Sequence, residues 1–172
     1  MSELPSWSDL KRLIAGPKPP VRARAIESSP DQNGEAWVLH DGQNGWHITE
    51  GLKTELTSVD STTIVDSDRF ETIRGMRVAS NNWVKSLIQG RLIAHLDEST
   101  GQVLDSARVE GRQCWVADVF GLRPDEPTAT FRVWVDTDTG IILREERTDA
   151  KAMVELRDIE LGDVIEETPP LL

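Results

Sequence analysis

The stretch Gly111–Glu146 reads GRQCWVADVFGLRPDEPTATFRVWVDTDTGIILREE and decides the fold. In its run 130–136, apolar side chains alternate with polar or bulkier ones, a period of two that is typical of a β-strand. Residues 137–140 supply turn chemistry, because short polar side chains bond their own backbone and glycine readily adopts a positive φ. Residues 141–147 then read as a returning strand. We therefore expect a β-hairpin in this part of the chain.

The run 112–120 precedes this hairpin and differs from it in pattern. Both of its alternating sets of side chains are mostly apolar, so we expect a strand that is covered on both faces. It contains the single cysteine, Cys114, which excludes an internal disulfide and any multi-cysteine zinc site. We expect a small buried hydrophobe here, with a reactive thiol as the alternative.

The remaining sequence indicates more of the same sheet and two helices. Ser6 or Ser8 could cap a helix that ends before Gly16, and a second helix is expected near 82–97, where apolar residues recur at helical spacing. Further strands are expected at 21–27, 35–41, 46–48, 52–59, 62–66, 72–78, 101–109 and 153–159. The predicted fold class is α+β, a curved antiparallel sheet covered by one or two helices.

The length and composition of the chain predict its domain organisation. A chain of 172 residues with 38% hydrophobic and 28% charged residues is typical of one globular domain. We expect a single domain, 1–172. Its parts are an N-terminal helix and proline-rich link (1–20), the curved sheet with its helix (21–160) and an acidic tail (161–172).

Charge and hydropathy exclude several classes of partner. The formal net charge is −11, with 30 acidic and 19 basic residues, which argues against binding to nucleic acid or to anionic membranes. No apolar run approaches the roughly 20 residues that cross a bilayer, so an integral membrane protein is not expected. The N-terminus has an acid before any base and no long apolar core. We expect a cytoplasmic protein as the sequence stands, or an exported one if a leader was removed.

Catalytic and metal-binding motifs are not found. His40, His47 and His95 share no metal-ligand spacing, and Asp136–Gly140 resembles a calcium loop only superficially, since Arg147 occupies the twelfth position. There is no phosphate-binding glycine loop and no nucleophile elbow. We therefore expect no catalytic residue, no metal and no cofactor, and predict that the protein is not an enzyme.

The tryptophans are the most informative remaining feature, with six in the chain and no tyrosine. They could be core packing, or several could line an apolar groove between sheet and helix that holds a greasy ligand. The candidate ligand-binding residues are Trp37, Trp46, Trp83, Leu87, Trp115 and Trp134.

The hairpin region resembles a known family. Trp134–Gly140 matches the pattern W-V-D-x-x-T-G, and Leu143–Glu146 matches L-R-x-E; both are typical of the LolA-like lipoprotein-carrier superfamily, which includes sigma-factor regulators of the RseB/MucB type. The hairpin Trp37–Trp46, with Asp41-Gly42 at its turn, fits an earlier segment of that family loosely. The resemblance implies an unclosed half-barrel with a helical lid over an apolar concave face, and binding of acyl chains or proteins.

Three functional hypotheses follow. The first is a non-enzymatic binding protein that holds a hydrophobic small molecule or lipid in the groove of the half-barrel. The second is a protein-interaction module that uses the same fold without a small ligand. The third, an enzyme of cone-like α+β fold, would need a buried His40 or His47 paired with an acid. Charged residues of alternating sign are expected to pin the register of the outward sheet face: Arg132, Arg144, Glu146, Glu155 and Arg157.

Overall fold

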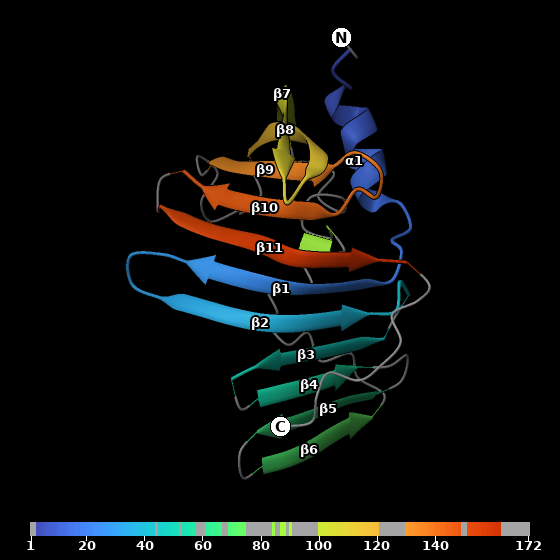
Figure 1. The fold of residues 1–172 in the computed structure, drawn as a ribbon, viewed down its shortest axis with the longest axis vertical. Coiled ribbons are helices and arrows are strands. Elements are labelled where there is room, and N and C mark those ends of the chain that lie inside the picture. The colour runs from blue at the N-terminus through green and yellow to red at the C-terminus, as the bar shows by residue number, and fades with distance from the viewer. Residues whose placement is uncertain are drawn as a thin grey trace.

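The chain forms one antiparallel sheet with a helix at one end, as a computed structural model shows (Figure 1). The structure describes residues 3–43, 45–51, 53–57, 61–66, 69–74, 84, 87–88, 90, 100–120, 130–148 and 151–162. The described strands are β1 (Val21–Ser28), β2 (Asn33–His40), β3 (Trp46–Glu50), β4 (Lys53–Thr57), β5 (Ser61–Asp66), β6 (Arg69–Arg74), β7 (Thr100–Val109), β8 (Arg112–Phe120), β9 (Thr130–Asp136), β10 (Ile142–Arg147) and β11 (Ala152–Leu161).

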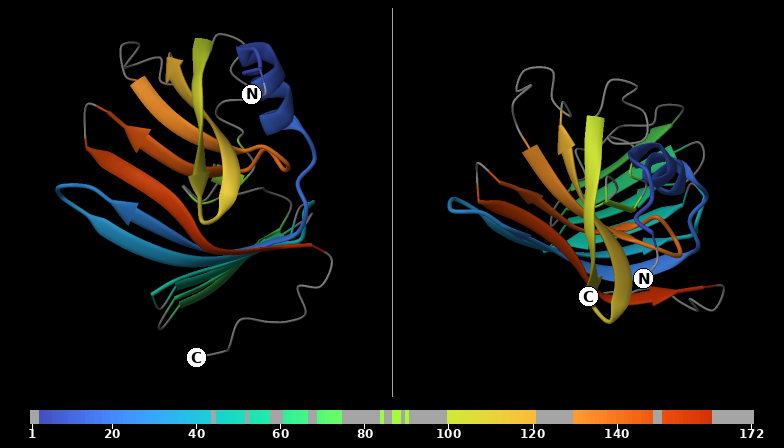
Figure 2. Two further views of the ribbon diagram at one scale, coloured as in Figure 1. Left: turned by 45° about the horizontal axis from the view of Figure 1, so that its top comes forward. Right: turned by 90° about the horizontal axis from the view of Figure 1, so that it is seen from above.

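Two meanders build this sheet. The 11 described strands follow the order β6-β5-β4-β3-β2-β1-β11-β10-β9-β8-β7, and every neighbouring pair is antiparallel. The first meander runs from β1 to β6 and the second from β7 to β11, and β11 returns to pair with β1. The strands β6 and β7 lie at opposite ends of the order, so hydrogen bonds do not close the sheet. The predicted curved, unclosed antiparallel sheet is confirmed (Figure 2).

The hairpin of β9 and β10 forms where the sequence predicted it. The Asp136 carboxylate accepts hydrogen bonds from the backbone N–H of Asp138 (3.0 Å) and Thr139 (2.9 Å) and from the Thr139 hydroxyl (3.0 Å). Gly140 has a φ of 69° and donates its N–H to the Asp136 carbonyl. The acid therefore shapes the turn through bonds to its own loop, as expected for a hairpin rather than a calcium loop.

The first helix also matches its prediction. Helix α1 (Trp7–Ala15) begins after Ser6, whose hydroxyl accepts the Asp9 N–H at 3.1 Å. This N-cap satisfies one of the backbone donors that a helix start leaves without an intrahelical partner. Leu10 and Ile14 share one side and are buried, while the helix stands beside β7 and β8 (Figure 2).

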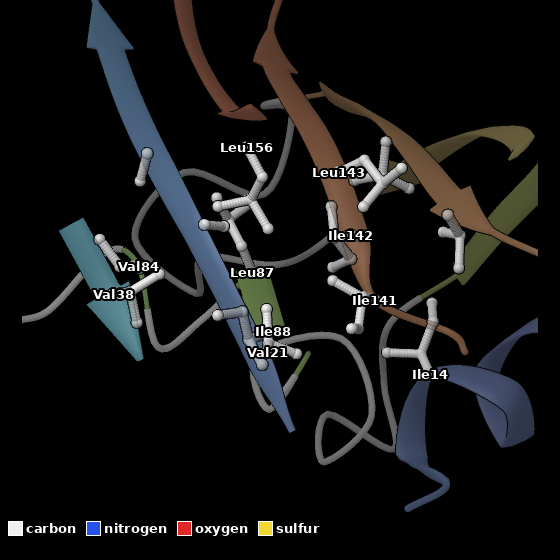
Figure 3. Packing of buried hydrophobic residues seen from close by; sticks show 14 of the residues in the cluster. Ile14, Val21, Val38, Val84, Leu87, Ile88, Ile141, Ile142, Leu143 and Leu156 are labelled. Atoms are coloured by element: carbon white, nitrogen blue, oxygen red, sulfur yellow. The ribbon is translucent and has the colours of Figure 1, made fainter. Parts of the chain in front are cut away.

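The second predicted helix is described at four positions. Val84, Leu87 and Ile88 are helical and buried, and Gly90 follows with a φ of 57°. The other residues of 82–97, Trp83 and His95 included, lie outside the described residues. Figure 3 places these three side chains among apolar residues of β1, β2, β11 and the β9–β10 connection.

Strand β6 begins three residues earlier than the sequence predicted. It spans Arg69–Arg74, whereas the expected strand was 72–78, of which 75–78 lie outside the described residues. Asp66 pairs with Arg69, so β6 starts directly after a two-residue connection. That register, rather than any strong alternation, fixes where the strand begins. Of the predicted acidic tail, 163–172 also lie outside the described residues.

Candidate binding surfaces

The two faces of the sheet can be assigned from the register, because residues paired across antiparallel strands point to the same side. One row joins Val21, His40 and Trp46 through consecutive pairs, and it lies on the side that α1 and Leu87 cover. We call this side the inner face. A second row joins Arg24, Trp37 and Thr49 on the opposite, outer face.

The structure does not bring all the candidate ligand-binding residues together. Trp46 lies on the inner face, and Trp115 pairs with the buried inner residue Val135. Leu87 packs into the same core from the helical segment, 2% exposed. Trp37 and Trp134 point to the outer face, in rows with Arg24 and Arg144. Trp83 lies outside the described residues.

The inner face is filled along its centre by the chain's own side chains. Three alanines of β1 and β2 form a shallow floor there, and all are at most 1% exposed: Ala23, Ala25 and Ala36. Val84, Leu87 and Ile88 lie over this side of the sheet, and Ile14 approaches from α1 (Figure 3). Small side chains on the strands thus accommodate larger ones from the helices, which is ordinary core packing.

Trp46 has a packing role within the second hairpin. Its ring stacks on the imidazole of His40, with the ring centroids 3.8 Å apart and the planes at 16°. His40 Nδ1 lies 2.9 Å from the Gly45 carbonyl, and Asp41 Oδ1, on an exposed side chain, is 3.8 Å from the same nitrogen. These contacts fix the β2–β3 hairpin.

An apolar patch occupies the outer face of β2, β3 and β4. Leu39 pairs with His47 and His47 pairs with Leu56, so these three form one row beside Trp37. Trp37 is 42% exposed and Leu56 is 41% exposed, whereas Leu39 and His47 are half-buried. We call these four residues the outer patch. Burial lowers the pKa of His47 from its ordinary value, so the imidazole is neutral at pH 7.

Ion pairs connect the charged side chains on the outer face of the other strands. Arg144 bonds Glu146, approaches Glu155 at 3.7 Å and stacks over the Trp134 ring at 4.9 Å. Arg157 bonds Glu155 at 2.8 Å within β11. Of the predicted register-pinning charges, Arg144 and Glu155 meet across the neighbouring strands β10 and β11. Other outer pairs are Arg24 with Asp158 and Glu35, Arg132 with Asp118, and Arg22 with Glu160. Trp134 is therefore part of a charged, internally neutralised surface.

Sequence reasoning missed the outer patch, although part of its signal was present. Alternation alone separates Trp37 and Leu39 from their inward neighbours in β2. It cannot join them to His47 and Leu56, because that requires the register between β2, β3 and β4.

Cys114 is buried, and burial raises the pKa of its thiol to about 11, so it is the packed hydrophobe that was predicted. Within the described part of the chain, no group of three or more His, Cys, Asp or Glu residues could hold a metal ion. None of the described helices has the length and apolar character to cross a membrane.

Several solved structures share this fold. The crystal structure of MucB superposes with a TM-score of 0.52 at 13% sequence identity, covering 91% of this chain and 58% of MucB. The complex of Pseudomonas aeruginosa MucA/MucB gives 0.50 at 13% identity, covering 91% of this chain and 56% of that one. LprF from Mycobacterium bovis gives 0.50 at 9% identity and covers 94% of each chain.

These likenesses establish a class of fold. The chain has the LolA-like, RseB/MucB-like fold that its hairpin motifs predicted. It spans less than two thirds of the length of the MucB chains that it matches. No protein-family model and no curated sequence matches it.

Proposed function

We propose that this chain is a non-enzymatic binding protein that holds a polypeptide partner on its outer patch. The observation that supports this is the contrast between the two faces. The inner face is occupied by the chain's own residues, with Leu87 at 2% exposure, whereas Trp37 and Leu56 keep more than a third of their surfaces open to solvent.

The composition of the outer patch suits a protein interface. Tryptophan and arginine are the residue types most often found at the energetic centre of interfaces. Trp37 lies directly across from Arg24, and Leu39 from Arg22. Truncation of such a central tryptophan typically costs about 2 kcal/mol or more, roughly a 30-fold loss of affinity.

Apolar contact, rather than opposite charge, would supply the affinity. Arg24, which pairs with Trp37 across β1 and β2, already bonds Asp158 at 2.8 Å and approaches Glu35 at 3.4 Å. The partner that fits is therefore a polypeptide segment with exposed apolar or aromatic side chains. The fold is compatible with such a role, since MucB has been crystallised in complex with MucA(peri).

A hydrophobic ligand on the inner face is the second candidate function. It is favoured by the alanine floor, which leaves room above the strands once Leu87 and its helical neighbours move aside. Trp46, Trp115 and Leu87 would then contact the ligand. This is the function implied by the family resemblance.

Affinity purification with matched variants tests the proposal. The protein would be isolated from its native cells as the unchanged chain, as Trp37→Ser/Leu56→Ser, and as Leu104→Ser. Leu104 is 38% exposed but lies on β7, away from the outer patch. We expect one stoichiometric polypeptide with the unchanged chain and Leu104→Ser, and its loss with the double variant.

Native mass spectrometry of the same preparations separates the two candidates. A retained apolar molecule that survives in the double variant, with no polypeptide in any preparation, would replace the proposal by the carrier function. Far-ultraviolet circular dichroism of all three proteins would confirm that the substitutions leave the sheet intact.

A further inference from the structure

The segment 7–20, made of α1 and the link Pro17–Pro20, runs along the open end of the sheet and touches it at widely separated places. We call this segment the strap. Glycines lie beneath it at four of the points where it approaches the rest of the fold. A Cβ added at Gly101 in β7 would sit 2.6 Å from the Trp7 ring, and one at Gly42, in the β2–β3 turn, would sit 2.8 Å from the Lys18 carbonyl.

Two further glycines complete this seat. A Cβ at Gly140 in the β9–β10 turn would collide with the Leu13 carbonyl, and a Cβ at Gly90 would collide with the Ile14 side chain. Gly101 is the informative member, because it has no positive φ that would itself require glycine. Its small size is needed only by the indole that lies on it.

Lys18 fixes the bend of the strap. Its ammonium donates hydrogen bonds to the carbonyls of Leu13 (3.1 Å), Ile14 (2.7 Å) and Gly16 (3.1 Å). These carbonyls lie at the C-terminal end of α1, where backbone acceptors need partners and a cation is favourable. The link is thereby folded back onto the helix, and Gly140 lies against both.

The strap joins strands that the hydrogen-bond ladder connects only indirectly. It touches β7 at Gly101 and the β2–β3 turn at Gly42, and five strands lie between β7 and β2 in the sheet: β8, β9, β10, β11 and β1. It therefore runs directly between two parts of the curved sheet that are far apart in the strand order (Figure 2).

From this geometry we infer that the strap is a conformational device that sets the curvature of the open sheet. Release of Trp7 from Gly101 lets β7–β10 move away from β1 and β2. The inner face of the sheet, and the side of α1 that carries the buried Leu10 and Ile14, then become accessible. This inference does not depend on the outer patch and goes beyond the proposed function.

Hydrogen exchange on the full chain tests this inference with a matched pair of variants. Gly101→Ala places a methyl group against the Trp7 ring. Gly34→Ala, in β2, has its nearest atom at an ordinary 3.4 Å and also lacks a positive φ. We expect Gly101→Ala to speed amide exchange at least roughly tenfold, both in α1 and in β9 and β10, and to increase binding of an anilinonaphthalene sulfonate dye. Gly34→Ala should change neither.

A double-variant cycle distinguishes the loss of the Trp7–Gly101 contact from general misfolding. Trp7→Ala alone should reproduce the faster exchange, and Trp7→Ala/Gly101→Ala should be no worse than Trp7→Ala, because both changes act through one contact. Faster exchange confined to α1, with β9 and β10 unchanged, would overturn the inference. Fully additive effects in the cycle would also overturn it.

Discussion

The Arg112 guanidinium, at the start of β8, hydrogen-bonds the carboxylate of Asp136 at the end of β9. The Asp136 side chain is 1% exposed, and that of Arg112 is 28% exposed. The pair joins two strands at the turn that defines the fold. It therefore holds the β9–β10 turn against the start of strand β8.

Asp136→Asn is expected to destabilise the fold by about 2–3 kcal/mol, because a charge-assisted bond is lost and the turn donors are less well satisfied. Urea unfolding would measure this. Asp138→Asn is the matched control: that side chain is 83% exposed and approaches Arg112 only at 3.9 Å, so a change within about 0.5 kcal/mol is expected. Equal effects at the two positions would contradict this account of the turn.

The same carboxylate predicts a pH dependence of stability. Burial would raise the pKa of Asp136, but the bonds from Arg112 and from the Thr139 backbone and hydroxyl outweigh it and lower that pKa below 3.8. The stabilisation is therefore present above about pH 4 and is lost as the pH falls toward the folded-state value. Unfolding free energies between about pH 2 and 6 should fall more steeply for the unchanged chain than for Asp136→Asn. Parallel curves would show that Asp136 does not carry this dependence.

Alanine substitutions at Leu87 and Leu56 compare the packing of the inner face with that of the outer patch. Leu87→Ala should cost about 2–5 kcal/mol, because it opens a cavity over the alanine floor. Leu56→Ala removes a side chain that is 41% exposed and should cost less than about 1 kcal/mol. Chemical denaturation checks both. A Leu87→Ala protein of unchanged stability would mean that the inner face is not packed as described, and would favour the carrier function.

Much of the sheet could be predicted from sequence. The β9–β10 hairpin has both clean alternation and a polar turn with glycine, so local signals agree with the final structure. Strands β4 and β5 are rich in threonine, and these strands and β6 have little apolar alternation, so the sequence did not define where β6 begins. The grouping of the tryptophans was less predictable: alternation separates Trp37 from Val38, but only the register shows that Trp37 and Trp115 lie on opposite faces. The glycine seat beneath α1 depends on contacts between distant segments, which no local pattern contains.

Partner binding should respond to pH more than to salt. His47 lies within the outer patch, and burial already lowers its pKa from 6.5. A bound partner would cover it further, so the neutral imidazole is favoured and affinity should fall as the pH drops through the lowered pKa of His47. His47→Gln should remove this dependence. Affinity should change less than about threefold between low and moderate salt, since the nearby charges are already paired. Isothermal titration with the purified partner measures both, and strong salt dependence would argue for charge recognition instead.

Photo-cross-linking from the two faces distinguishes a polypeptide on the outer patch from an apolar ligand on the inner face. Benzoylphenylalanine would replace Trp37 on the outer face in one protein and Trp115 on the inner face in another, followed by illumination in cells and intact-mass analysis. We expect a polypeptide adduct at position 37 and none at position 115. An apolar small-molecule adduct at position 115, with nothing captured at position 37, would contradict it.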